Sequence, residues 1–97
     1  MKLRILRRAL GQLSDGSRFY ERQSHGLGSY FRSCLVNDIE RLNITAGVHE
    51  LVPEGFYRAI SRRFPFAIYY LLENEEIIVS AILDSRRDPE WIRRQLR

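Results

Sequence analysis

The chain has 97 residues, 44% hydrophobic and 29% charged, which predicts one soluble globular domain spanning residues 1–97. The formal net charge is +4, and Lys2 is the only lysine. Cys34 is the only cysteine, which excludes an intramolecular disulfide and a cysteine-based metal site. No apolar run approaches membrane-spanning length. Charged residues interrupt the first apolar segment, which is incompatible with a signal peptide. We therefore expect a cytoplasmic protein without a membrane partner.

Arginine carries nearly all of the positive charge. A guanidinium group makes planar, two-point contacts with carboxylates and phosphates. The composition therefore predicts an acidic partner, which is a nucleic acid, an acidic protein or both. The alternative is that the charge only keeps the surface solvated.

The first half of the chain predicts a short strand followed by two helices. Leu3 and Ile5 alternate with basic residues, as in a β-strand. Apolar residues at helical spacing predict a helix from about residue 7 to 23, in which Gly11 and Gly16 each cost about 1 kcal/mol relative to alanine. A turn over residues 24–28 follows.

The turn holds Gly26 and Gly28, which can take the positive φ that a tight link between two helices requires. The second helix is predicted from about residue 29 to 42, with a stripe that is apolar except at Asp38. Two helices joined by so short a turn form an antiparallel hairpin.

The second half predicts three strands and a short terminal helix. Residues 43–55 are expected to be irregular. Strands are predicted at residues 56–63, 64–72 and 77–83, with a polar hairpin turn at 73–76. Apolar residues occupy both alternating positions of the middle strand, so we expect it to be central and covered on both faces. Asp88 and Pro89 then form a helix start.

The order β-α-α-β-β-β-α predicts the α+β class. Strands that are grouped after helices favour a helical hairpin packed on one face of a twisted, mainly antiparallel sheet.

Three blocks of sequence resemble one family. The first is residues 19–24 (FYERQS) with Gly26–Gly28 and Phe31, the second is residues 62–70 (RRFPFAIYY), and the third is residues 83–89 (LDSRRDP) with Trp91. In this order and at this spacing they resemble the RelE/ParE superfamily of small bacterial toxins from type II toxin–antitoxin systems. The closer resemblance is to the ParE-like branch, often called plasmid stabilisation proteins. A departure is Asp84, where many relatives have histidine.

The resemblance implies two alternative activities. RelE-like members are ribosome-dependent mRNA endonucleases, which need an acid, a base and cations that stabilise the charged transition state. ParE-like members are protein inhibitors of DNA gyrase and do no bond chemistry. A third hypothesis, suggested by the two glycines of the first helix, is a non-toxic member that only binds its antitoxin.

The residues favour the inhibitor. Four arginines are suited to stabilise phosphate charge, but residues 90–97 contain no tyrosine, histidine or lysine. Tyr69 and Tyr70 are interpreted as core residues, and His25 and His49 as surface loop residues. We therefore predict no catalytic residue, no metal and no cofactor. The four arginines are Arg62, Arg63, Arg86 and Arg87.

The candidate site residues are basic or aromatic. The resemblance implies target contact by the C-terminal set, which is Arg86, Arg87, Trp91, Arg93, Arg94 and Arg97. Arg62 and Arg63 form a second basic cluster, with side chains expected on opposite faces of a strand. Structural alternatives stay open: Arg87 closes a turn, the terminal arginines are solvated, or Trp91 packs on the sheet.

The resemblance also implies partners. A cognate antitoxin, expected to be small, acidic and partly disordered, folds against the sheet and the hairpin and forms a hetero-oligomer with the toxin. DNA gyrase is the second expected partner, together with the DNA in its complex.

Overall fold

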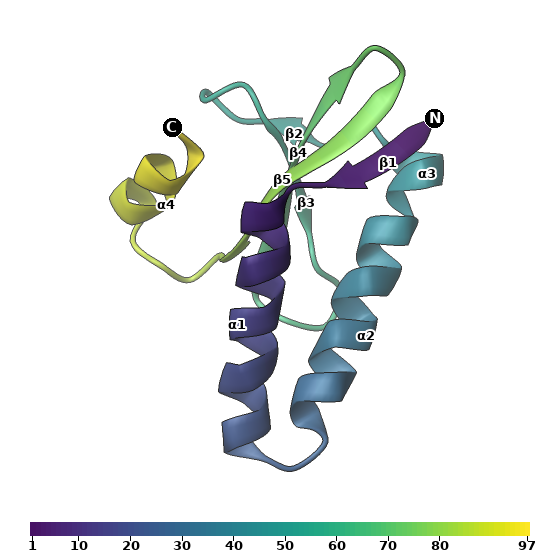
Figure 1. Ribbon diagram of the computed structural model, residues 1–97. Helices are drawn as coiled ribbons and strands as arrows, with labels where there is room; N and C mark the ends of the chain where they lie inside the picture. Colours follow the sequence, from purple (N-terminus) through teal and green to yellow (C-terminus); the bar gives the residue numbers. More distant parts are fainter.

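The computed structural model describes residues 1–97 and has the predicted order of helices and strands, with two additions (Figure 1). A strand precedes the helical hairpin, and the remaining strands and a terminal helix follow it. The elements are β1 (Lys2–Ile5), α1 (Arg7–Gln23), α2 (Leu27–Glu40), α3 (Leu42–Thr45), β2 (Glu50–Leu51), β3 (Tyr57–Ile60), β4 (Phe66–Glu73), β5 (Glu76–Asp84) and α4 (Pro89–Leu96).

The five strands form one sheet in the order β1-β5-β4-β3-β2. β1 pairs in parallel with β5, and every other neighbouring pair is antiparallel. The predicted α+β fold with a mainly antiparallel sheet is therefore confirmed. No helix is long and apolar enough to cross a membrane.

The two additions lie in the segment that was expected to be irregular. α3 continues the path of α2 after a break at Arg41, and β2 pairs with β3 through only two residues. Elements of four and two residues carry too little periodicity to be recognised in a sequence.

The middle strand is central and buried on both faces, as predicted. Alternate residues of β4 enter two different clusters: Ile68 and Tyr70 join the one under the helical hairpin, and Ala67 and Tyr69 join the one under α4. The sheet is therefore a layer between the hairpin and α4, which lie on either side of it in Figure 1.

The hairpin turn contains one left-handed glycine instead of two. Gly26 has φ of +87° and provides the left-handed residue of the turn, but α2 already begins at Leu27, so Gly28 is helical and does not take positive φ. A Cβ at Gly28 would lie 2.4 Å from the Ser17 carbonyl oxygen, so this glycine permits close helix packing. The Glu21 carboxylate accepts hydrogen bonds from the N–H groups of Gly26 and Gly28, each at 2.9 Å, and ties the two helices together.

Candidate functional site

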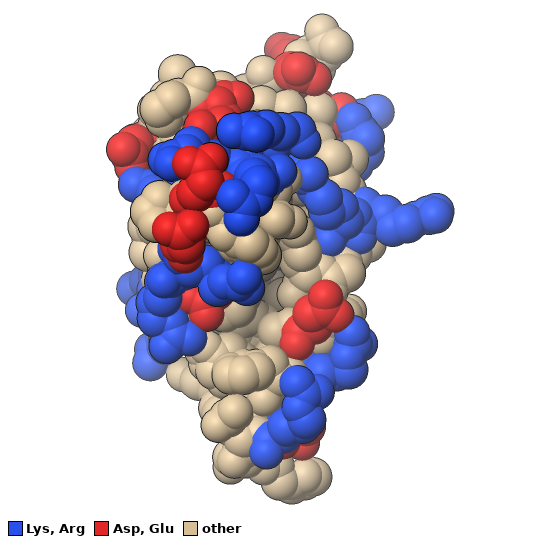
Figure 2. All heavy atoms as spheres, turned by 90° about the vertical axis from the view of Figure 1, so that its left-hand side faces the viewer, with Lys and Arg blue, Asp and Glu red and all other residues tan.

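The candidate arginines lie on two bends at one end of the sheet and on α4. The bend between β3 and β4 carries Arg62 and Arg63, and the turn between β5 and α4 carries Arg86 and Arg87. The two bends touch, because the backbone N–H of Ser85 donates to the Pro65 carbonyl at 2.8 Å. On the face with α4 and α1, basic side chains gather over the upper half with acidic ones between them (Figure 2).

Arg86 is bound by the carboxylate two residues before it. Its Nε and Nη2 atoms donate to the two oxygens of Asp84 at 3.1 and 2.9 Å, and its backbone N–H donates to the same carboxylate at 2.8 Å. The hydrogen bond from the Arg86 side chain is the main cause that lowers the pKa of Asp84, although burial opposes it. Arg86 is therefore held as part of the turn.

Arg87 stacks on Trp91. The guanidinium carbon lies 3.7 Å from the centroid of the indole ring, in cation–π geometry. Trp91 is half-buried against the cluster under α4, which confirms that it packs on the sheet. Asp88 is the N-cap residue and Pro89 the first helical residue, as predicted, but the Asp88 side chain makes no capping hydrogen bond.

The arginines of α4 differ in their partners. Arg93 donates to Glu90 at 2.7 Å, and Arg97 lies 3.7 Å from the same carboxylate. The hydrogen bond from Arg93 is the main cause that lowers the pKa of Glu90. Arg94 is exposed and makes no ion pair or hydrogen bond, so it is the α4 arginine whose guanidinium is free for a partner.

The prediction that Arg62 and Arg63 lie in a strand with opposed side chains is wrong. β3 ends at Ile60, and the chain bends until β4 begins at Phe66. The bend is fixed by Asp38 of α2, which accepts a hydrogen bond from the Ser61 hydroxyl at 2.7 Å and one from the Arg62 backbone N–H at 3.4 Å. A tertiary contact with a helix therefore ends the strand.

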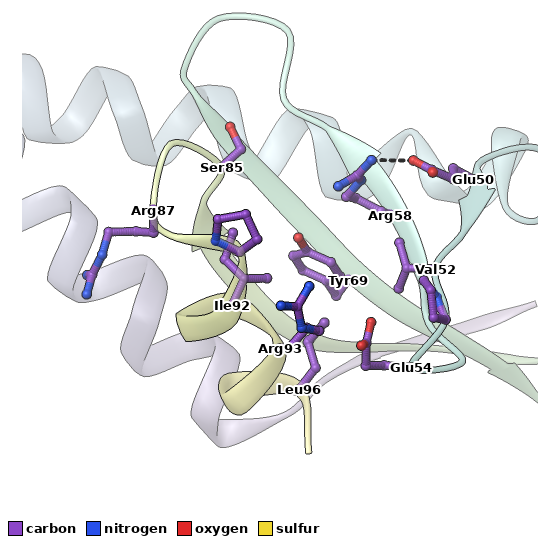
Figure 3. Close-up of a pocket in the computed structure, with 12 residues that line it drawn as sticks. Glu50, Val52, Glu54, Arg58, Tyr69, Ser85, Arg87, Ile92, Arg93 and Leu96 are labelled. Carbon is purple, nitrogen blue, oxygen red and sulfur yellow. Dashed lines mark hydrogen bonds and ion pairs between the residues drawn. The ribbon is translucent and has the colours of Figure 1, made fainter.

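A pocket of about 260 Å³ lies between α4, β3 and the segment around β2 (Figure 3). Arg58 of β3 forms an ion pair with Glu50 of β2 at its wall. Burial opposes the charge of Arg58, but interactions with the Glu50 and Tyr69 side chains outweigh it and raise the pKa of the guanidinium. The polar lining residues are Glu50, Glu54, Arg58, Tyr69, Ser85, Arg87 and Arg93.

This pocket corrects one inference from the sequence. No acid–base group was expected near the arginines, yet Tyr69, Glu50 and Glu54 share the pocket with Arg58 and Arg93. Tyr69 is a core residue as interpreted, only 1% exposed. In Figure 3 Tyr69 lies between Arg58 and Arg93, while the Arg87 side chain reaches away from them.

Sequence reasoning missed Arg58. A signal for it was present: Tyr57 and Ala59 flank it, and strand alternation places it on the opposite face from those two residues. Which element covers that face is a tertiary fact, so its neighbours Glu50 and Arg93 had no signal in the sequence.

The histidines have different environments. His25 is exposed at the hairpin tip, as predicted, with Nδ1 3.3 Å from a carboxylate oxygen of Glu21. His49 lies in the loop before β2, as predicted, but it is half-buried. Its Nδ1 lies 2.5 Å from the Tyr70 hydroxyl, and that hydroxyl accepts a hydrogen bond from the Gly47 N–H at 2.9 Å.

Comparison with known proteins bears on the fold. No protein-family model and no curated protein sequence matches this chain. Among solved structures, a chain of the chromosomal ParDE TA system from P. aeruginosa is similar with a TM-score of 0.72 and 20% sequence identity. The similarity covers 84% of this chain and 92% of that chain. The chain therefore shares its fold with that chain of the ParDE system, in agreement with the fold that its three sequence blocks predicted.

Proposed function

We propose that this chain is the toxin of a type II toxin–antitoxin system, that it inhibits DNA gyrase, and that a cognate antitoxin neutralises it by direct binding. The observation that carries the proposal is the shared fold with a chain of the ParDE system over most of both chains. The three sequence blocks support it independently, because they depend on residue identities and spacing alone.

The arrangement of the arginines supports an inhibitor that acts by contact. Arg62 and Arg63 line a hollow beside α2, whereas Arg87 lines hollows beside α4, so the four arginines of the sequence motifs do not converge on one cleft. Arg86 is already bound by Asp84. The surface for the target is proposed to be the β5–α4 turn and α4, with Arg87, Trp91, Arg93, Arg94 and Arg97 as contacts and Arg86 as a fixed part of the turn.

A second candidate function is the ribosome-dependent mRNA endonuclease. The pocket of Figure 3 supports it, because Tyr69 lies between Arg58 and Arg93. A phenol is able to transfer a proton, and the guanidinium groups are able to stabilise phosphate charge. Two features weigh against it: the Tyr69 side chain is buried, and Glu50 already neutralises Arg58.

A gyrase supercoiling assay without ribosomes tests the first function. The purified chain is expected to block supercoiling, and Arg94→Glu should raise the concentration needed for half inhibition. Arg22→Glu is the matched control, because Arg22 is exposed near the hairpin tip and makes no ion pair. Unimpaired supercoiling at every excess of the chain would contradict gyrase as the target.

An mRNA cleavage assay with ribosomes tests the second function. If the pocket is catalytic, Tyr69→Phe removes the proton-transfer group and should slow cleavage by about 100-fold or more, while it leaves gyrase inhibition unchanged. Intact transcripts in the presence of ribosomes and a chain that arrests growth would exclude the endonuclease. A chain that does neither and permits growth would correspond to the non-toxic member.

A further inference from the structure

A second hollow, which we call the edge groove, lies where the end of α2, α3 and the end of β3 meet. Its volume is about 230 Å³. Its lining combines arginines with exposed apolar residues, including Arg41, Val48, Ile60 and Arg62. Nothing in the proposed gyrase contact or in the pocket under α4 uses these residues.

The arginines of the edge groove have no acidic partner. Arg41 and Arg62 line it together with Asp38, and an adjoining hollow shares these three residues and adds Arg63. None of the three arginines forms an ion pair, whereas Arg86 and Arg93 near α4 do. The Asp38 carboxylate is already engaged by the Ser61 hydroxyl and the Arg62 backbone. The groove therefore has an excess of positive charge.

Two large apolar side chains are exposed beside these arginines. Val48 is 77% exposed and Ile60 is 57% exposed. A partner that is purely anionic would satisfy the arginines but leave this apolar surface in water. A segment that alternates acidic and branched apolar residues would cover both.

The backbone of β3 is also open at this place. Its pairing with β2 ends at Arg58. The N–H of Ser61 donates to the Phe66 carbonyl of β4, and strand backbone groups alternate in direction, so the N–H and C=O of Ile60 point away from β4. Neither group has a hydrogen-bond partner. Ile60 is the last residue of β3, so this one residue offers a backbone donor and acceptor to an added extended segment.

The other edge of the sheet lacks this combination. β1 carries Lys2 and Arg4, and a lysine on an edge strand opposes pairing. Arg4 is bound by Glu76.

We propose that the edge groove is the docking site for an extended, acidic and partly apolar segment of a protein partner. The segment places carboxylates against Arg41, Arg62 and Arg63, covers Val48 and Ile60, and pairs with the backbone of Ile60. That this partner is the antitoxin rests on the proposed function; the chemistry of the groove does not.

The test uses the full chain and a fluorescein-labelled ten-residue peptide of alternating glutamate and valine as the probe, followed by fluorescence anisotropy. We expect saturable one-to-one binding, weakened at least about tenfold by the double variant Arg41→Glu/Arg62→Glu. The matched control is Arg22→Glu/Arg32→Glu, which changes the charge equally at exposed, unpaired arginines of α1 and α2. It should change the affinity by less than about twofold.

Two further measurements separate docking from attraction by charge alone. The amide of Ile60 should become protected from hydrogen exchange when the peptide binds. A duplex oligonucleotide should compete poorly, because it has no apolar face for Val48 and Ile60. Absent binding, equal loss in both double variants, an unprotected Ile60 amide, or equal competition by DNA would each overturn the proposal.

The outcome is independent of toxicity, since the binding assay contains neither gyrase nor ribosomes. A chain that binds the peptide but inhibits nothing would retain the groove and refute the proposed function. A chain that inhibits gyrase but does not bind the peptide would refute the groove and retain the proposed function.

Discussion

The two faces of the sheet differ in how much apolar surface covers them. Under the hairpin, 13 buried residues form one cluster, and the rings of Tyr20, Phe31, Phe64 and Phe66 contact one another. Under α4, the corresponding cluster has 6 buried residues, and α4 supplies only Leu96 to it. Because hydrophobic stabilisation scales with buried apolar area, the hairpin face should contribute most of the stability.

The two faces also differ in role: the hairpin face contributes most of the stability, and the α4 face carries most of the candidate contact residues. The thin α4 face is bordered by the pocket of Figure 3 and by most of the candidate contact arginines. Parts of a protein with few buried apolar contacts open at lower free energy than the rest. Changes at α4 should therefore alter function before they unfold the chain, while changes under the hairpin should unfold it first.

The largest effect is expected from Phe31→Ala. Phe31 has no exposed surface, and its ring centroid lies 5.0 Å from that of Phe64 and 4.9 Å from that of Phe66. Truncation should lower the free energy of unfolding by about 3–5 kcal/mol, measured by urea denaturation. Phe19→Ala is the control. Phe19 is 45% exposed, so its truncation should lower the free energy of unfolding much less.

Leu96→Ala tests the other face. Leu96 is 5% exposed and is the buried anchor of α4. We expect a loss of about 2 kcal/mol, at the lower end for such truncations, and faster hydrogen exchange at the amides of α4 than in the hairpin. A loss equal to that of Phe31→Ala would show that the two faces contribute alike.

Two glycines of α1 distinguish the packed side of the hairpin from its open side. A Cβ at Gly16 would lie 2.7 Å from the Phe31 ring, whereas a Cβ at Gly11 has no atom within 4 Å. Gly11→Ala should stabilise the helix by about 0.5–1 kcal/mol. Gly16→Ala gains the same helix propensity but should be destabilising by about 1 kcal/mol, since overpacking costs roughly 1–3 kcal/mol. Thermal denaturation of both variants measures these changes in stability. Stabilisation by Gly16→Ala would contradict the close packing.

The smallest effect concerns pH on the hairpin face. Burial, with a further contribution from the charge of Arg41, lowers the pKa of His49. The unfolded chain therefore binds a proton more readily than the folded one, and stability should fall as pH drops below the ordinary histidine pKa of about 6.5. Urea midpoints at pH 7.5 and pH 5.5 measure this loss.

His49→Gln should reduce the difference between the two midpoints. His25→Gln is the control, because the exposed His25 side chain has no buried partner. An unchanged difference in His49→Gln would assign the pH dependence to other groups.

Periodicity allowed the long elements to be predicted. β4 and β5 have apolar residues at both alternating positions, and their burial on both faces follows from that pattern. α1 and α2 begin and end within about two residues of the predicted positions, because their apolar stripes extend over several turns. The sequence blocks at residues 19–31, 62–70 and 83–91 also predicted the fold that the ParDE comparison confirms.

The site was only partly predictable. Arg87 lies in the turn just before α4 and Trp91 near the start of α4, so their stacking is a contact between residues that are close in the sequence. Glu50 and Arg58 face each other across the short β2–β3 pair, Arg93 reaches them from α4, and Asp38 ends β3 from a separate helix. No spacing rule links residues that only the folded chain brings together.

Composition and periodicity by themselves determined an arginine-rich α+β chain with a helical hairpin, a central doubly buried strand and a basic C-terminus. Arg86 and Arg93 pair with carboxylates only two and three residues away in the sequence. Tertiary structure decided that Glu50 neutralises Arg58, and that Arg41, Arg62 and Arg63 form no ion pair. The physical reason is that contacts within a turn or one helical turn depend on residues a few positions apart, whereas the charge balance of a surface depends on every segment that meets there.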